Sequence, residues 1–170
     1  MNKRKKAFQA LQFIIPIIKR YNFRWMITGG FASYVYGVKR PITDIDIDIQ
    51  TSKNHKKFKG FLNELKPFIT QRLEHFNDIN YDYYNFEITY HGQLIDICPS
   101  KELRIFNKRN EGYVSLYGLF GGFPKPKIIK WYGLRLPLLP KQMIIKNKEM
   151  LIWKRKPDYK DINGLDKINR

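Results

Sequence analysis

The chain has 170 residues, of which 43% are hydrophobic and 15% are aromatic. This length and composition suffice for one compact domain with a buried core and exclude a disordered polypeptide. Its 32 Lys and Arg residues against 15 Asp and Glu residues give a formal net charge of +17, which would attract polyanions such as nucleic acids and nucleoside triphosphates. A biased composition with many solvated lysines accounts for the same charge equally well, so charge alone identifies no partner.

The sequence carries no clear signal for export or membrane insertion. Cys98 is the single cysteine, so no internal disulfide can form. No stretch reaches the ~18 uninterrupted apolar residues of a membrane helix. The basic start of the chain is followed by a short apolar segment without a small-residue cleavage site, which predicts an amphipathic helix and no signal peptide. We expect a cytoplasmic protein that does not enter a membrane.

Helical and strand-like patterns alternate along the first hundred residues. The periodicity of apolar residues and the positions of glycine and proline set the boundaries of these elements. The predicted elements are a helix over 5–20, a strand over 23–28, a helix over 31–36, a strand over 42–50, a helix over 53–65 and strands over 81–90 and 93–98. The last two strands are separated by His91 and Gly92, which predicts a tight hairpin.

The remainder of the chain is predicted to be mainly hairpin and helix. Residues 112–126 are rich in glycine and proline and are expected to form a loop, and a hairpin is predicted over 127–139. Helices are predicted over 141–153 and from 159 onward. Together the elements indicate one α+β domain over 1–170, with a mixed β-sheet flanked by helices. Its core is expected over about 22–100, and a C-terminal hairpin and a small helical part over about 125–170.

Three aspartates alternate with isoleucines in the segment PITDIDIDIQ, residues 41–50. Alternate residues of a strand share a face and lie about 6.5 to 7 Å apart, so Asp44, Asp46 and Asp48 form a row. Like charges in such a row destabilise the fold unless a cation balances them, and carboxylate oxygens suit Mg²⁺, Mn²⁺ or Ca²⁺. The spacing does not fit an EF-hand loop. The alternative is an exposed edge strand whose aspartates discourage pairing with another sheet.

The pair Gly29–Gly30 joins a predicted strand to the start of a predicted helix. Backbone N–H groups at such a junction are free to bind phosphate oxygens, and glycine permits a close approach. A glycine pair alone more often only makes a turn. Because the aspartate strand follows fourteen residues after Gly30, the two elements together suggest one site for a triphosphate and its metal ion.

The segment GGFASYVYGVKRPITDIDI, residues 29–47, resembles the signature of the polymerase-beta-like nucleotidyltransferase superfamily. That signature is a Gly-Gly or Gly-Ser helix start followed by Asp-x-Asp on the next strand. The resemblance is closest to the branch that contains the abortive-infection toxin type and the lincosamide and aminoglycoside nucleotidyltransferases. The matching positions are Gly29, Gly30, Ala32, Gly37, Arg40, Asp44, Ile45 and Asp46. The resemblance selects Asp44 and Asp46 as the metal pair and leaves Asp48 as an extra carboxylate.

The resemblance implies further site residues. The superfamily takes a third acid from a later strand, and the segment GQLIDIC offers Asp96. The C-terminal part of the chain resembles the family's tail, where Lys154 and Lys160 would help to neutralise a triphosphate. Solvated helix charge explains these two lysines equally well. Arg40 is expected either to contact phosphate or to form a structural ion pair.

The activity implied is transfer of a nucleoside monophosphate from an NTP to an acceptor hydroxyl, with release of pyrophosphate. Asp44, Asp46 and Asp96 would hold Mg²⁺ or Mn²⁺, and Asp96 would also help to deprotonate the acceptor. The acceptor is a small molecule, a tRNA end or a protein, and the basic surface favours RNA or another polyanion. A partner protein or a homodimer could complete the pocket.

Two alternatives to a transferase remain open at this stage. The first is a catalytically idle relative of the fold that binds nucleotide or RNA, such as one half of a toxin–antitoxin pair. The second is a basic RNA-binding module in which the aspartates only prevent edge pairing.

Overall fold

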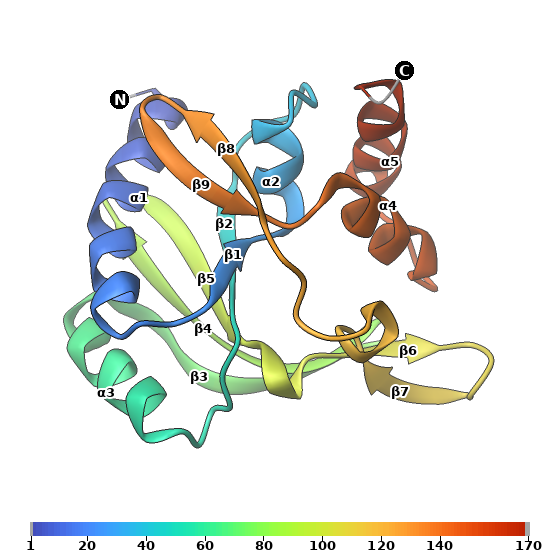
Figure 1. Cartoon of the computed structure of the whole chain (residues 1–170), viewed down its shortest axis with the longest axis horizontal. Helices are drawn as coiled ribbons and strands as arrows, with labels where there is room; N and C mark the ends of the chain where they lie inside the picture. Colours follow the sequence, from blue (N-terminus) through green and yellow to red (C-terminus); the bar gives the residue numbers. More distant parts are fainter. Residues whose placement is uncertain (1, 169–170) are drawn as a thin grey trace.

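The computed structural model describes residues 2–168 (Figure 1). The helices are α1 (Lys3–Arg20), α2 (Gly29–Val35), α3 (Lys56–Leu65), α4 (Lys141–Met150) and α5 (Lys156–Ile168). The strands are β1 (Trp25–Ile27), β2 (Asp44–Ile49), β3 (Ile69–Asn77), β4 (Tyr81–Tyr90), β5 (Gln93–Pro99), β6 (Arg104–Asn107), β7 (Gly112–Ser115), β8 (Lys127–Trp131) and β9 (Leu134–Leu138). The order of these elements confirms the predicted α+β class.

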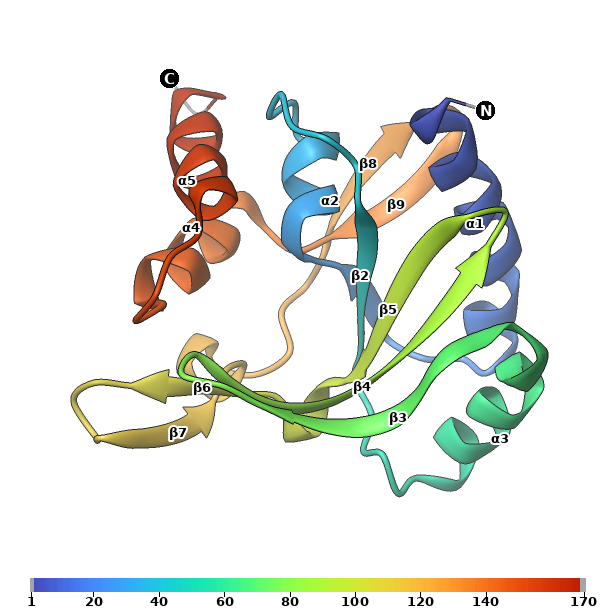
Figure 2. The same cartoon turned by 180° about the vertical axis from the view of Figure 1, so that it is seen from behind.

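All nine strands belong to one sheet, in the order β7-β6-β4-β5-β2-β1-β9-β8, with β3 paired to β4. Most neighbours are antiparallel, whereas β2 pairs with β5 and β1 pairs with β9 in parallel, so the sheet is mixed as predicted. Figures 1 and 2 show α1 and α3 on one side of the curled sheet and α2, α4 and α5 on the other. The two faces of the sheet are therefore covered by different helices.

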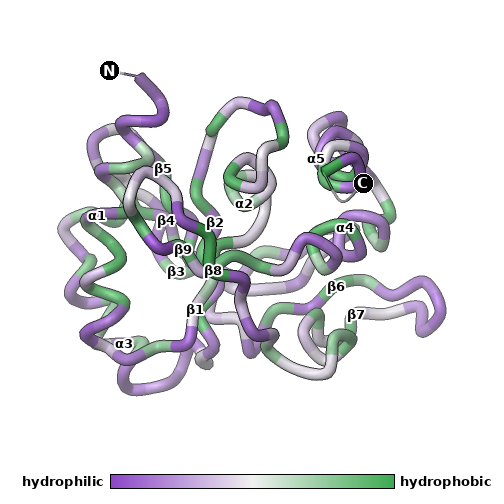
Figure 3. The backbone as a smooth tube through the Cα atoms, turned by 45° about the horizontal axis from the view of Figure 1, so that its top comes forward, coloured by the Kyte–Doolittle hydropathy of each residue, from purple (hydrophilic) through white to green (hydrophobic). Residues whose placement is uncertain are grey.

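The isoleucines of β2 form the core face of the sheet. Ile45, Ile47 and Ile49 are fully buried, together with the stripe of apolar side chains on α1. In Figure 3, α1 alternates between hydrophobic and hydrophilic residues along its length, as expected of a helix with one buried face and one exposed face. Since successive strand residues point to opposite faces, the aspartates of β2 lie on the side of α2, α4 and α5.

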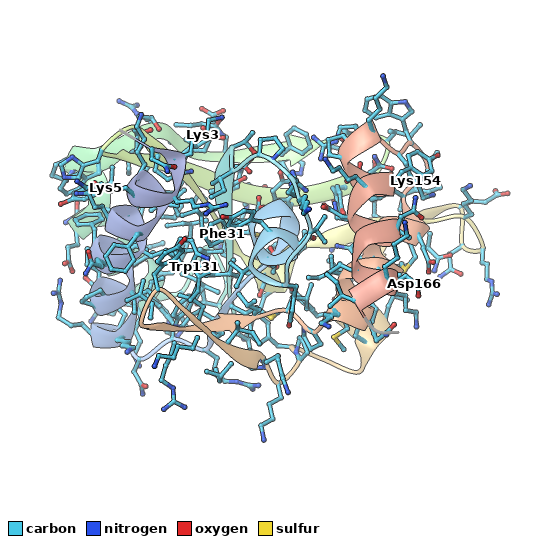
Figure 4. The ribbon with its side chains drawn as sticks, turned by 90° about the horizontal axis from the view of Figure 1, so that it is seen from above. Lys3, Lys5, Phe31, Trp131, Lys154 and Asp166 are labelled. Carbon is cyan, nitrogen blue, oxygen red and sulfur yellow. The ribbon has the colours of Figure 1, made fainter. Side chains whose placement is uncertain are left out.

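Both predicted hairpins are present. His91 and Gly92 have φ values of 49° and 70°, and Tyr132 and Gly133 have φ values of 46° and 84°, which are the left-handed conformations of a two-residue hairpin turn. The second hairpin also fixes α2, because the rings of Phe31 and Trp131 meet edge to face with centroids 5.3 Å apart (Figure 4). This contact holds the start of α2 in place beside the sheet.

Three strands differ from the sequence-based expectation. Residues 112–115 form β7 and not a loop, and neither β6 nor β3 was predicted. Strand β3 pairs with β4 alone among the described strands, and most of its side chains are exposed, so it lacks the apolar alternation that marks a half-buried strand. Helix α4 ends at Met150 and not at residue 153, because Leu151 turns to an extended conformation with ψ of 133°.

None of the helices in residues 2–168 combines the length and the apolar composition that crossing a membrane requires.

Candidate functional site

The three predicted metal-binding aspartates lie on adjacent strands. Because β2 and β5 are parallel neighbours, Asp46 is the direct cross-strand partner of Asp96, and Asp44 is on the same face of β2. All three line a cleft of about 740 Å³ between the sheet and helices α4 and α5. The hydroxyl of Thr43 donates to Asp44 Oδ1 at 2.7 Å. The cleft therefore brings Asp96 beside two acids that lie 50 and 52 residues earlier in the chain.

The electrostatics of these carboxylates indicate unbalanced negative charge. Burial, reinforced by the charges of Asp44 and Asp96, raises the pKa of Asp46 to about 8. Burial also raises the pKa of Asp96 to about 7, although a hydrogen bond from Asn85 opposes the shift. The positive charge of Lys148 acts in the opposite direction and only partly offsets the increase in the pKa of Asp46. A bound cation would relieve this strain.

Asp48, the extra carboxylate, has a different environment. It is 6% exposed, and the hydroxyl of Tyr117 donates a hydrogen bond to its Oδ2. Burial raises the pKa of Asp48 to about 7 even so. Tyr117 lies in the segment after β7 whose form the sequence did not reveal, and this hydrogen bond joins the segment to β2.

The glycine pair lies against the carboxylates and the guanidinium of the site. Gly29 has a φ of 59°, and a β-carbon at that position would collide with the carboxylate of Asp46. The N–H of Gly30 donates a hydrogen bond to Asp46, and a β-carbon on Gly30 would collide with the guanidinium of Arg40. Glycine is therefore favoured at position 29 by both its φ and the nearness of Asp46, whereas Gly30 leaves room for the guanidinium of Arg40. Both residues line the cleft.

Arg40 forms the ion-pair contact that was one of its two predicted roles. Its guanidinium binds Asp161 of α5, and the exposed fractions of the two side chains are 12% and 0%. Lys148 of α4 binds the same carboxylate at 3.2 Å and Asp158 at 2.6 Å. Arg40 thus connects the segment after α2 to α5, and Lys148 connects α4 to α5.

The two predicted lysines lie in different places. Lys160 is exposed and lines the cleft. Lys154 does not line it, and its Nζ donates to the backbone oxygen of Leu151 at 2.8 Å. Figure 4 labels Lys154 and Asp166 at the C-terminal side of the molecule, opposite Lys3 and Lys5 on α1.

Sequence reasoning missed Lys148 and Asn85. Lys148 is 8% exposed and occupies the inward-facing stripe of α4 with Ile144 and Ile145, so a lysine at an apolar helical position was the available signal. Asn85 is 5% exposed, and its Nδ2 donates to Asp96 Oδ1 at 3.0 Å while its own Oδ1 has no hydrogen-bond partner. No sequence pattern marked Asn85, because its role depends on the pairing of β4 with β5.

The donor set fits a hard divalent cation. It consists of carboxylate oxygens that lie together and lack a neutralising partner, which is the chemistry that Mg²⁺ and Mn²⁺ prefer. Within residues 2–168 no three acidic, His or Cys side chains are already arranged closely enough to enclose an ion.

Comparison with known proteins identifies the fold. At the level of sequence, the chain matches no protein-family model and no curated protein. Its structure is similar to that of a nucleotidyltransferase-type protein from Thermotoga maritima, with a TM-score of 0.61, 15% identity and coverage of 99% of this chain and 89% of that one.

Two antibiotic-modifying enzymes are also similar in structure. The lincosamide antibiotic adenylyltransferase LnuA, solved with lincomycin, has a TM-score of 0.56 at 16% identity, covering 94% of this chain and 96% of its own. ANT(2″)-Ia, solved with adenylyl-2″-tobramycin, has a TM-score of 0.53 at 14% identity, covering 95% and 91%. The predicted resemblance is thereby confirmed at the level of the fold, and the chain has the polymerase-beta-like nucleotidyltransferase fold.

Proposed function

We propose that the protein is a metal-dependent nucleotidyltransferase that moves a nucleoside monophosphate from an NTP to an acceptor hydroxyl. The observation that carries the proposal is the grouping of Asp44, Asp46 and Asp96 on one face of the parallel pair β2 and β5, beside Gly29 and Gly30. Burial raises the pKa values of Asp46 and Asp96, and a bound cation would stabilise their ionised forms. The similarity of fold to adenylyltransferases supports the same conclusion.

The residues of the cleft suit the separate parts of this reaction. Mg²⁺ or Mn²⁺ held by the three aspartates would neutralise the triphosphate. Asp96 faces Asp46 across the parallel pair β2 and β5, and its carboxylate would accept the proton of the acceptor hydroxyl. Lys148 and Lys160 line the opposite wall and add positive charge for the triphosphate and the pyrophosphate that leaves.

The test is incorporation of label from each α-labelled NTP, with Mg²⁺, into small-molecule, total-tRNA and protein acceptors. Asp46→Asn is expected to reduce transfer by about 10³-fold, because it removes a charge on which the metal and the transition state depend. The matched control is Glu74→Gln, which changes an exposed strand carboxylate outside the cleft. Equal transfer by the wild type and Asp46→Asn would refute the proposal.

A catalytically idle fold gives a different result in a second measurement. Fluorescent NTP analogues would bind the wild-type protein with Mg²⁺, yet no acceptor would become labelled. Affinity for the analogue that is lost in Asp46→Asn would then identify the cleft as a nucleotide-binding site only.

A further inference from the structure

Strand β8 forms an open edge of the sheet. It is the last strand in the order of the sheet, so β9 is its one neighbour among the described strands. Figures 1 and 2 show the β8–β9 hairpin and the β6–β7 hairpin at opposite ends of the sheet. The edge of β3 is broken by register shifts and β7 is shorter, whereas β8 pairs with β9 in unbroken register. The edge of β8 is therefore a regular template for a further strand.

The backbone groups of Ile128 and Lys130 point outward from this edge. Leu139, directly after β9, donates its N–H to the backbone oxygen of Ile27 on β1 at 2.9 Å, so Pro137 two residues earlier also faces β1. The cross-strand partner of Pro137 is Ile128, whose N–H and C=O therefore point away from β9. Lys130 has the same orientation, since it lies two residues further along the strand. The N–H and C=O groups of these two residues can pair with an incoming strand.

A cavity of about 500 Å³, the β8 pocket, lies beside the same strand. Its lining residues are Val35, Tyr36, Lys127, Ile129, Pro140 and Lys141. Ile129 points to the same face of β8 as Trp131, which packs against Phe31, so the β8 pocket is on the α2 side of the sheet. The hydroxyl of Tyr36 donates to the backbone oxygen of Leu139 at 3.1 Å, which fixes the ring in the wall. The β8 pocket therefore offers a preformed, largely apolar space to alternate side chains of an added strand.

The edge carries positive charge without local compensation in the sequence. Residues 112–148, which include the whole β8–β9 hairpin, contain no Asp or Glu. Lys127 and Lys130 are exposed, and Lys130 lies directly opposite Arg135 of β9. Like charges at directly opposed positions destabilise a strand pair, so an acid on a neighbouring strand would stabilise this one. Lys141 adds positive charge beside the β8 pocket, with its Nζ 5.5 Å from the centroid of the Tyr36 ring.

These charges decide which partner the edge fits. If two copies of this chain paired through β8, Lys127 and Lys130 of one copy would lie beside those of the other, and lysines at an edge oppose such self-pairing. The net charge of +17 repels a second copy as well. An acidic extended segment meets every requirement, because its backbone continues the sheet, its carboxylates face lysines and its apolar side chains reach the β8 pocket.

We propose that the outer edge of β8 binds an extended, acidic segment of a partner protein as an additional strand. The backbone of Ile128 and Lys130 forms the hydrogen bonds, and an apolar side chain of the segment occupies the β8 pocket. Carboxylates of the segment lie beside Lys127 and Lys130. Because the β8 pocket and the cleft of the aspartates share no lining residue, this interaction does not depend on the transferase function proposed above.

The test measures binding of a fluorescein-labelled heptapeptide of alternating glutamate and valine by fluorescence anisotropy. The same peptide with every amide nitrogen methylated cannot donate backbone hydrogen bonds and should bind at least about tenfold more weakly. A peptide of alternating glutamate and threonine keeps the shape of valine but places hydroxyls in the β8 pocket, and should bind about fivefold more weakly. A peptide of alternating lysine and valine should not bind, because the edge repels it.

Variants of β8 separate backbone pairing from charge. Ile128→Pro removes an outward N–H and should weaken binding of the glutamate–valine peptide about tenfold, whereas Ile128→Thr keeps the N–H and should bind nearly like the wild type. The double variant Lys127→Gln/Lys130→Gln should weaken binding about fivefold and reduce its salt dependence. The matched control is Lys108→Gln/Arg109→Gln, which removes the same charge from the exposed turn of the β6–β7 hairpin at the opposite end of the sheet (Figure 1). This control should bind like the wild type.

Hydrogen exchange of the wild-type protein locates the peptide without any variant. The amide hydrogens of Ile128 and Lys130 should exchange more slowly when the glutamate–valine peptide is bound, because they then donate to it. Those of Ile129 and Trp131 face β9 and should change little. Four outcomes would overturn the inference: no saturable binding of the glutamate–valine peptide, equal affinity for its methylated form, unchanged exchange at Ile128 and Lys130, or a dimer of the protein alone that Ile128→Pro dissociates.

Discussion

Carboxylates line both walls of the cleft, and the two walls differ in how the negative charge is balanced. On the helical wall, Asp158 accepts hydrogen bonds from Lys148 and from the backbone N–H of Arg155. Burial alone would raise the pKa of Asp158, but these hydrogen bonds and the charge of Lys148 lower it below its ordinary value. On the sheet wall, Asp46 and Asp96 face each other with raised pKa values. The helical wall thus stabilises ionised Asp158, although burial raises the pKa of Asp161 there despite Lys148 and Arg40, whereas on the sheet wall burial and neighbouring carboxylates act together on Asp46.

The largest expected effect tests the helical wall. Asp158→Asn removes one of the two carboxylates that pair with Lys148, whose side chain is only 10% exposed, and should lower the free energy of unfolding by about 3 kcal/mol. Urea denaturation measures this. Asp82→Asn, whose partner His75 is 49% exposed, should cost less than about 1 kcal/mol. Similar losses in the two variants would contradict the distinction between buried and surface pairs.

The next effect concerns the close approach of α2 to the sheet wall. Gly29→Ala places a β-carbon in a backbone with φ of 59° and against the carboxylate of Asp46. The strain should lower the free energy of unfolding by about 2 kcal/mol and displace Asp46. Gly133→Ala is the matched control, because Gly133 has a φ of 84° with no atom within 4 Å of a new β-carbon. Only Gly29→Ala should lose nucleotide transfer.

Asn85 provides a smaller and more specific test. Its amide holds one oxygen of Asp96, so Asn85→Ala should lower kcat about tenfold and raise the Mg²⁺ concentration needed for half-maximal activity. Asn85→Asp places a second acid beside Asp96 and should be worse than Asn85→Ala. Thermal unfolding serves as the control measurement. A loss of stability without any change in Mg²⁺ dependence would limit Asn85 to a packing role.

The last test concerns the pH dependence of the metal-free protein. The folded-state pKa of Asp46 is about 8 against an ordinary value of 3.8, so the folded protein binds more protons than the unfolded chain between these values. The free energy of unfolding in EDTA should therefore fall as pH rises from 5 to 8. Asp46→Asn should flatten that decline, and Mg²⁺ should oppose it. A rise in stability over this range would show that the carboxylates are already compensated.

The sequence was most informative where local pattern and tertiary role coincide. The alternation of Asp and Ile in residues 44–49 predicted both the strand and its polar face, because side-chain direction in a strand depends only on position. The sequence also indicated that Gly29 and Gly30 permit a close approach to the backbone at the start of α2. The third acid, Asp96, came from a resemblance, since the parallel pairing of β2 with β5 joins segments 50 residues apart.

Other parts of the site have no local signature. Lys148 is one lysine among many, and its burial depends on α5 supplying Asp158 and Asp161. Strand β3 could not be recognised because its exposed side chains give no alternation, and its pairing with β4 has register shifts. These features follow from contacts between distant segments, which periodicity does not report.

The hydrogen bonds of Asn80 have a consequence for the order of events during synthesis. Residue 80 is joined to residues 152 and 153, which are 72 and 73 positions later in the chain. A ribosome-bound chain that has completed β2 and β5 already contains Asp44, Asp46 and Asp96, yet it lacks α4 with Lys148 and the backbone N–H groups of residues 152 and 153 that bind Asn80. Because contacts of such long range form late, a partly made chain should be inert toward substrate until these last helices dock.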